Sequence, residues 1–247
     1  MNILIFNWRD LKHSWAGGGE IYISEQAKRW VKKGHAVTIF CGNDIEKKLP
    51  EKETIDNITI YRKGNRYTVY LWAFWYYLSK FQGKFDVLID VVNGIPFFTP
   101  LFSRLPKLCV VYHVHGKQFF YELPFPLNYI GYGIEKYIFP RISRTTSTIA
   151  ISQTTKRQLI QNGHNPSHIH IVYCGINGKP KTKNSTRTKF RHPTLLYLGR
   201  IKKYKRVDLL VKLFPEIIKR IPNARLIIAG WGTEASLITD QVMKSPL

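Results

Sequence analysis

Short apolar runs alternate with amphipathic stretches along most of this chain, and this alternation predicts strands followed by helices. The strands expected before residue 178 cover residues 2–6, 36–40, 58–61, 86–90, 108–112, 148–151 and 169–173. The helices expected between them cover residues 19–33, 68–81, 127–139 and 153–162. Strands that alternate with helices in this way favour a parallel α/β sheet.

Local signals support two of these helices. In the helix expected over 19–33, Ile23, Ala27 and Trp30 recur at helical spacing and predict one buried stripe. Ser152 is a suitable N-cap for the helix over 153–162, and Gly163 is a suitable residue for its end.

A basic segment divides the chain. Residues 178–193 hold six cations, no acid and almost no apolar group, so we expect an exposed linker rather than part of a core. Nucleic-acid binding by this segment is the less favoured alternative. The expected domains are therefore a Rossmann-like domain over 1–177, the linker over 178–193 and a second α/β unit over 194–247.

The second unit is expected to contain a strand over 194–198, a helix over 206–220 and a strand over 225–229. A Rossmann-like domain needs more strands than these, and typical domains run to roughly 100–200 residues. We therefore expect this domain to be incomplete, because the chain is a fragment, a natural truncation or half of a split enzyme.

The charge balance is strongly basic. Lys and Arg number 38 and Asp and Glu 16, which gives a net charge of +22. Such a surface attracts polyanions, which include nucleic acids, anionic membranes and phosphorylated substrates. The cations are spread over both halves and no known nucleic-acid-binding module is present, so a nucleic-acid partner is not expected.

Aromatic residues cluster over 67–81, 97–102 and 119–139, in a chain that is rich in cations. This mixture suits a membrane interface, although core helices of the first domain are an equal alternative. No apolar run reaches the roughly 20 residues that span a bilayer, and Met1 leads directly into a strand without a signal peptide. We expect a cytoplasmic protein; peripheral attachment to the inner face of a membrane stays open.

The cysteines are Cys41, Cys109 and Cys174. They lie far apart, in or next to predicted strands, so we expect buried thiols in a reducing compartment rather than disulfides or a zinc site.

The main candidate for chemistry is the run from Leu195 to Leu210. An apolar strand leads into Gly199-Arg200, Lys205 follows, and an amphipathic helix begins. Two cations at the carboxyl end of a strand, beside the N–H groups of a helix N-terminus, favour an anion such as a diphosphate. Solvated surface charges are the alternative.

This run resembles the donor-phosphate site of the family 4 retaining glycosyltransferases, whose GT-B fold places two Rossmann-like domains across a cleft. Other motifs of the chain are also similar to those of the family and occur in the same order. They are Asn2–Phe6, Gly17-Gly18-Gly19-Glu20, Gly34-His35-Ala36-Val37-Thr38, Ile149-Ala150-Ile151-Ser152, Ile169–Asn177 and Ile227–Gly232. The resemblance covers residues 1–232 and implies a GT-B-like α/β fold.

The resemblance also implies roles for individual residues. Arg200 and Lys205 would bind the donor diphosphate, with the backbone of Gly17 and Gly18 closing from the opposite domain; a plain tight turn is the alternative for the glycines. His113 at the end of a strand would contact the donor sugar beside the reacting centre, and is favoured over His115. Without the resemblance, either histidine would be interpreted as structural.

The partners implied are a nucleotide-sugar donor and a glycan or lipid-linked acceptor, with retention at the transferred sugar. No cofactor and no bound metal are expected, because the family's cations and helix N-termini stabilise the leaving diphosphate.

The chain departs from the family after Gly232. The family's donor site continues with Glu, seven residues and Glu, whereas here only Glu234 and Asp240 carry acids. The alternative function is therefore a non-catalytic partner or pseudoenzyme that binds acceptor or an anionic membrane. A separate chain that supplies the missing part is a further expected partner.

Overall fold

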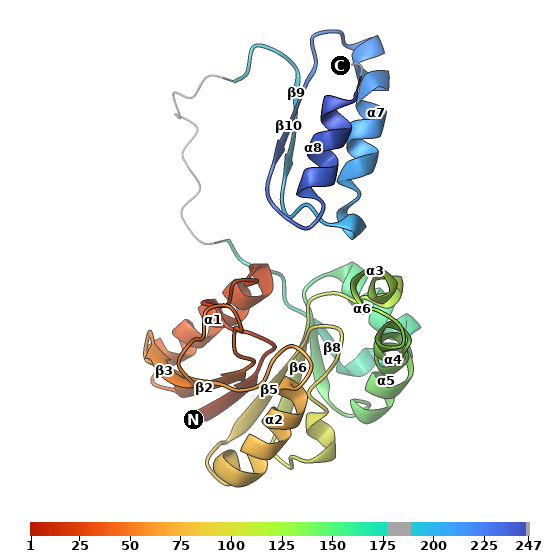
Figure 1. Cartoon of the computed structure of the whole chain (residues 1–247). Coiled ribbons are helices and arrows are strands. Elements are labelled where there is room, and N and C mark those ends of the chain that lie inside the picture. Colours follow the sequence, from red (N-terminus) through yellow and green to blue (C-terminus); the bar gives the residue numbers. More distant parts are fainter. Residues whose placement is uncertain (177–188, 246–247) are drawn as a thin grey trace. The chain divides into compact units, whose positions relative to one another are not determined.

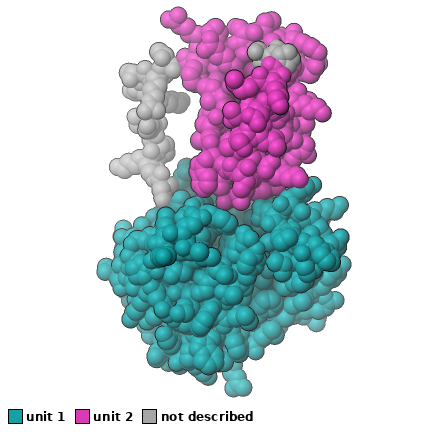
Figure 2. Space-filling model, in the orientation of Figure 1, with its two compact units in different colours: residues 1–176 teal, residues 177–247 magenta. Residues whose placement is uncertain are grey.

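The computed structural model describes residues 1–176 and 189–245. It divides the chain into two compact units, Met1–Ile176 (unit 1) and Asn177–Leu247 (unit 2), which Figure 2 colours separately. Most of the segment expected as a basic linker, residues 178–193, lies outside the described residues.

Unit 1 is built on an eight-stranded sheet with the order β3-β4-β2-β1-β5-β6-β7-β8. Neighbouring strands are parallel except β3 and β4, which are antiparallel. The strands are β1 Asn2–Phe6, β2 Ala36–Cys41, β3 Lys52–Ile55, β4 Ile58–Arg62, β5 Val87–Val92, β6 Lys107–Val111, β7 Ser147–Ala150 and β8 Ile169–Ile171. The parallel α/β sheet expected from the sequence is confirmed.

Strand β3 was not expected, because Lys52 and Glu53 interrupt its apolar pattern. It pairs with β4 through a turn in which Asp56 and Asn57 both have positive φ, 52° and 60°. Two central residues in this left-handed region are typical of a type I′ hairpin turn, for which Asp and Asn are suitable residues. The Asp-Asn pair was therefore the local signal for this hairpin.

The helices of unit 1 pack on both faces of the sheet. They are α1 Gly18–Lys32, α2 Val69–Tyr76, α3 Phe119–Glu122, α4 Leu127–Gly133, α5 Phe139–Ile142 and α6 Gln153–Gln161. Two π-helical turns extend them: η1 Tyr77–Phe81 continues α2, and η4 Ile134–Ile138 joins α4 to α5. The expected N-cap is present: Ser152 Oγ accepts the Thr155 N–H at 3.0 Å.

The core lies on the two faces of the sheet, because successive side chains of a strand point to opposite sides. In β1, Ile3 and Ile5 pack with α1, whereas Leu4 and Phe6 pack with α2. Figure 1 shows α1 and α2 on opposite sides of the strands. The sheet therefore carries a helix-covered core on each face, as in a doubly wound fold.

Unit 2 has a parallel pair of strands, β9 Thr194–Leu198 and β10 Arg225–Ala229. A short 3-10 helix, η6 Lys203–Lys205, precedes α7 Val207–Arg220, and α8 Ala235–Met243 follows β10. Helix α8 was not expected. Val207, Val211 and Ile238 bury against one face of the strands together with Ile201.

One expectation about the cysteines is wrong. Cys41 and Cys109 are buried, but Cys174 is exposed, because β8 ends at Ile171 and the chain beyond it leaves the sheet. Within the described part of the chain, no helix combines the length and the apolar character that crossing a membrane requires.

Candidate functional site

The carboxyl edge of the unit 1 sheet brings the glycine loop and the histidine segment together. Helix α1 begins at Gly18, after the loop that follows β1, and β6 ends at Val111, two residues before His113. The Tyr112 hydroxyl donates to the Gly19 carbonyl oxygen at 2.7 Å. A β-carbon on Gly19 would lie 2.8 Å from the Tyr112 ring. The glycine at residue 19 thus permits this close approach.

A buried ion pair holds the start of α1. The Glu20 carboxylate accepts the Gly17 N–H at 2.7 Å and lies 3.0 Å from Arg9 Nε. Arg9 and Glu20 are both buried. The Gly17 N–H is therefore engaged within the protein, whereas Gly18 is exposed and no atom lies within 4 Å of the position of a β-carbon there. A glutamate three residues after the N-cap was the sequence signal for this arrangement.

The two histidines have different surroundings. Their ring centroids are 4.1 Å apart, and the His115 ring also stacks on Phe119 at 5.1 Å. His113 is exposed, whereas the His115 side chain is only 10% exposed. A ligand at this edge of the sheet can therefore reach His113, whereas the His115 ring packs against those of His113 and Phe119.

Glu135 holds the segment that carries both histidines. This buried residue of η4 accepts the backbone N–H groups of His115 and Gly116, each at 2.7 Å. Its Oε1 also lies 3.5 Å from His115 Nδ1. Glu135 was not predicted from the sequence. The available signal was a single acid inside the apolar stretch 127–139.

In unit 2, Arg200 and Lys205 lie between the carboxyl end of β9 and the N-terminus of α7. Tyr197 OH donates to the Arg200 carbonyl oxygen at 2.8 Å, and Lys205 is the last residue of η6. Lys205 Nζ lies 5.3 Å from the Tyr204 ring centroid. This strand-end position beside a helix N-terminus suits an anionic ligand.

Gly230 and Gly232 allow a second close approach in this loop. A β-carbon at Gly230 would lie 1.8 Å from the Gly199 carbonyl oxygen, and one at Gly232 would lie 2.1 Å from that of Ile201. The backbones are also joined by the Ile201 N–H, which donates to the Trp231 carbonyl oxygen at 2.8 Å. The two glycines thus set the path of the segment that carries Arg200.

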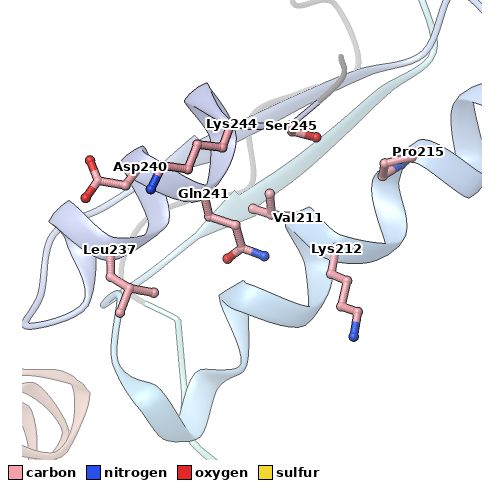
Figure 3. Close-up of a pocket in the computed structure, with 8 residues that line it drawn as sticks. All are labelled: Val211, Lys212, Pro215, Leu237, Asp240, Gln241, Lys244 and Ser245. Carbon is pink, nitrogen blue, oxygen red and sulfur yellow. The ribbon is translucent and has the colours of Figure 1, made fainter.

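An open groove of about 580 Å³ lies between α7 and α8 in unit 2. Figure 3 shows its lining side chains, which come from both helices and from the two residues after α8: Val211, Lys212, Pro215, Leu237, Asp240, Gln241, Lys244 and Ser245. None of the candidate residues lines it. Across residues 1–176 and 189–245, no group of three or more His, Cys, Asp and Glu residues is arranged to hold a metal ion.

Two family models match the chain. The model for Glycosyltransferase Family 4 matches residues 16–178, and the model for Glycosyl transferases group 1 matches residues 178–244. A similar protein is MJ1069, an uncharacterized glycosyltransferase of Methanocaldococcus jannaschii, which is 24% identical over 95% of this chain. The chain spans 64% of the length of that relative.

Solved structures are similar in fold at low sequence identity. HepE of Anabaena, solved in complex with UDP-glucose, has a TM-score of 0.64 and 12% identity, over 99% of this chain and 66% of HepE. Sucrose-phosphate synthase of Thermosynechococcus elongatus has a TM-score of 0.62 and 15% identity, over 93% of this chain and 62% of the synthase. The GT-B-like α/β fold expected from the sequence is confirmed. Because the first family model covers well over half of its residues, the chain belongs to Glycosyltransferase Family 4.

Proposed function

We propose that this chain transfers a sugar from a nucleotide-sugar donor to a glycan or lipid-linked acceptor, with retention. The observation that carries the proposal is the placement of Arg200 and Lys205 at the carboxyl end of β9, directly before α7. HepE was solved with UDP-glucose and with UDP and glucose. A donor of that class is the one we propose here.

In this proposal the leaving diphosphate binds to unit 2. Arg200 supplies a planar fork of N–H donors, Lys205 supplies a compact charge, and the first N–H groups of α7 point toward the same end of β9. Groups already fixed at the place where negative charge develops stabilise the transition state more than the ground state. They would do so without a bound metal or cofactor.

Unit 1 would provide the donor sugar contact and part of the diphosphate site. His113 is the accessible histidine, so we assign to it the contact with the donor sugar, with His115 as its support. Gly18 would offer its backbone N–H from the first turn of α1, where helix N–H groups have no partner within the helix. The Gly17 N–H already donates to Glu20, so Gly17 would contribute space rather than a hydrogen bond.

A non-catalytic function is the second candidate. Residues 233–247 contain the acids Glu234 and Asp240, and no two glutamates separated by seven residues lie in this stretch. In that case a separate chain would supply the remaining donor contacts. Both candidates include a cytoplasmic location with attachment to an anionic membrane surface, which the charge of +22 favours.

Calorimetric titration of the whole chain with UDP and with UDP-glucose tests the donor site. Arg200→Ala is expected to weaken binding about 10- to 100-fold, since a hydrogen bond to a charged group contributes about 1.5–3 kcal/mol. Arg220→Ala is the matched control, because Arg220 is exposed at the opposite end of α7. Equal affinity of Arg200→Ala and the unmodified chain would remove Arg200 from the site. Binding without sugar transfer would favour the non-catalytic candidate.

A further inference from the structure

We infer that the solvent-facing side of α2 and η1 is the surface by which this protein rests on an anionic lipid bilayer. The inference names the contact for the membrane attachment proposed above and rests on that part of the proposal. The surface consists of Leu71, Phe74, Trp75 and Leu78, and is called the α2 face.

The α2 face follows from helical geometry. Its four residues recur at intervals of three and four, so they lie along one side of the helix. Leu71 is 72% exposed and Trp75 is 60% exposed. The other side of the same segment is buried against the sheet through Val69, Ala73, Tyr76, Tyr77 and Phe81. The segment is therefore apolar on both sides, although only one side has the protein core to pack against.

A neighbouring loop extends the apolar surface. Phe102 lies 5.3 Å from Phe74 and 5.2 Å from Tyr77, measured between ring centroids. Leu101, the residue before it, is 67% exposed. Large exposed apolar patches with a polar rim mark interaction sites, whereas single exposed apolar residues are ordinary.

The length of the segment determines how it can meet a bilayer. The helical run from Val69 to Phe81 is shorter than the roughly 20 residues that span the hydrocarbon core. Because its other side is packed against the sheet, this segment can meet a bilayer only along its exposed side, whose apolar side chains would enter the upper parts of the acyl chains. Tryptophan such as Trp75 is enriched at that depth, because its ring is apolar and its N–H is polar.

The charge of the residues near the α2 face indicates what kind of partner this surface binds. Residues 57–85 contain five cations and no acid. Lys80, Lys84 and Arg104 are exposed, and they follow Leu78 and Leu101 by two to six residues in the chain. Two exposed acids accompany these cations. Glu51 is engaged by Lys63 at 3.3 Å and by the Tyr76 hydroxyl, and Asp86, two residues after Lys84, accepts the Asn2 N–H at 2.6 Å. An apolar centre with a cationic rim matches an anionic lipid surface.

The same rim argues against a second copy of the chain as the occupant. In a two-fold symmetric dimer the same patch contacts itself, so each cationic rim would face an identical one. Like charges brought together at an interface repel. The bilayer is therefore the occupant to which the structure points.

Vesicle flotation of the whole chain tests the inference without any use of the donor site. Vesicles of phosphatidylcholine alone are compared with vesicles that also contain phosphatidylglycerol. We expect the protein to float only with the anionic vesicles. The double variant Leu71→Ser/Trp75→Ser is expected to reduce the floating fraction about tenfold, because it removes the most exposed apolar groups of the interface.

Two matched controls accompany that variant. Tyr129→Ser/Ile130→Ser removes two exposed apolar side chains from α4 and is expected to float like the unmodified protein. Lys80→Ala/Lys84→Ala is expected to float several-fold less, whereas Lys32→Ala/Lys33→Ala, with the same change in net charge at the end of α1, is not.

Several outcomes would overturn the inference: no flotation of the unmodified protein, flotation of Leu71→Ser/Trp75→Ser at the unmodified level, or an equal loss in the α4 variant. A dimer in gel filtration that becomes a monomer in Leu71→Ser/Trp75→Ser, with no vesicle binding, would identify a second copy as the occupant. UDP binding is measured on the same samples. A protein that binds UDP but gives one of these outcomes contradicts the inference about the α2 face and leaves the proposed donor site in place.

Discussion

The carboxylate of Glu135 accepts the backbone N–H of His115 at 2.7 Å, although the two residues are 20 positions apart in the chain. Its second oxygen accepts the Gly116 N–H, also at 2.7 Å. Glu135 thereby fixes the segment that begins at the end of β6 and carries His113. It is a positioning residue, because it acts on the candidate site through the backbone of its neighbours.

We expect Glu135→Ala to destabilise unit 1, because two backbone donors lose their acceptor. The free energy of unfolding should fall by about 1–3 kcal/mol, the usual range for a lost acceptor of partly buried groups. Chemical denaturation of the whole chain measures this change. Glu122→Ala removes an exposed glutamate that bonds only a side chain, Gln118, within the same segment, and should change stability far less.

His113→Ala should impair sugar transfer with little loss of stability, within about 1–2 kcal/mol for an exposed side chain. His115→Ala should destabilise the protein more, because it removes a ring that packs between His113 and Phe119. Thermal unfolding and a donor-turnover assay on the same preparations distinguish the two. If His115→Ala alone loses transfer at unchanged stability, the assignment within the pair is wrong.

Gly18→Ala should weaken UDP binding without loss of stability, whereas Gly19→Ala should lower the stability of the protein. The β-carbon of Ala at residue 18 meets no atom within 4 Å, so stability should be kept, while the methyl group crowds the proposed diphosphate position. The β-carbon at residue 19 would lie 2.8 Å from the Tyr112 ring, and such overpacking destabilises by about 1–3 kcal/mol. UDP titration and chemical denaturation measure the two effects. Full UDP affinity in Gly18→Ala would exclude Gly18 from the site.

Gly230→Ala should displace the segment that carries Arg200. The new β-carbon would need the space of the Gly199 carbonyl oxygen, 1.8 Å away, so the backbone must move. Hydrogen exchange should accelerate at the Gly199 and Ile201 amides, which donate to Ala229 and Trp231. Gly133→Ala is the control, because that glycine is helical and no atom lies within 4 Å of a β-carbon there. Unchanged exchange in Gly230→Ala would contradict the predicted displacement.

Asp90 should make stability fall as the pH rises. Burial raises the pKa of this carboxyl to about 6, although the Phe97 N–H and the Thr99 hydroxyl donate to it at 3.1 and 2.9 Å. In the unfolded chain the pKa is about 3.9. Between these values the folded state holds a proton that the unfolded state has released, so the free energy of unfolding should fall by about 2–3 kcal/mol from pH 4 to pH 7.

The comparison with Asp90→Asn isolates this effect, because the amide keeps the shape and does not ionise. Burial lowers the pKa of His164 to about 4, and that group makes stability rise over the same pH range. The two proteins are therefore compared at each pH by chemical denaturation, so that the contribution of His164 cancels. The difference between them should grow from pH 4 to pH 7, and a constant difference would contradict the raised pKa of Asp90.

The candidate site was predictable only in part. Arg200 and Lys205 were identifiable from the residues themselves, because they follow an apolar strand and precede a helix. Gly18 and His113 were identified through the family resemblance. Their roles stay predictions. Arg9 and Glu135 were not identified, since their partners lie far away in the sequence or in a loop whose path depends on packing.

The sequence by itself determined the alternation of strands and helices. The strands expected over 2–6, 194–198 and 225–229 have the same bounds in the structure, because a short apolar run between turn signals is a local property. The tertiary structure alone decided which side of α2 is covered, since that segment is apolar all round and its periodicity does not distinguish the two sides. It also decided that Gly230 passes against Gly199 and that Glu135 meets His115. Contacts between distant residues depend on strand order and packing, and a local pattern carries no information about either.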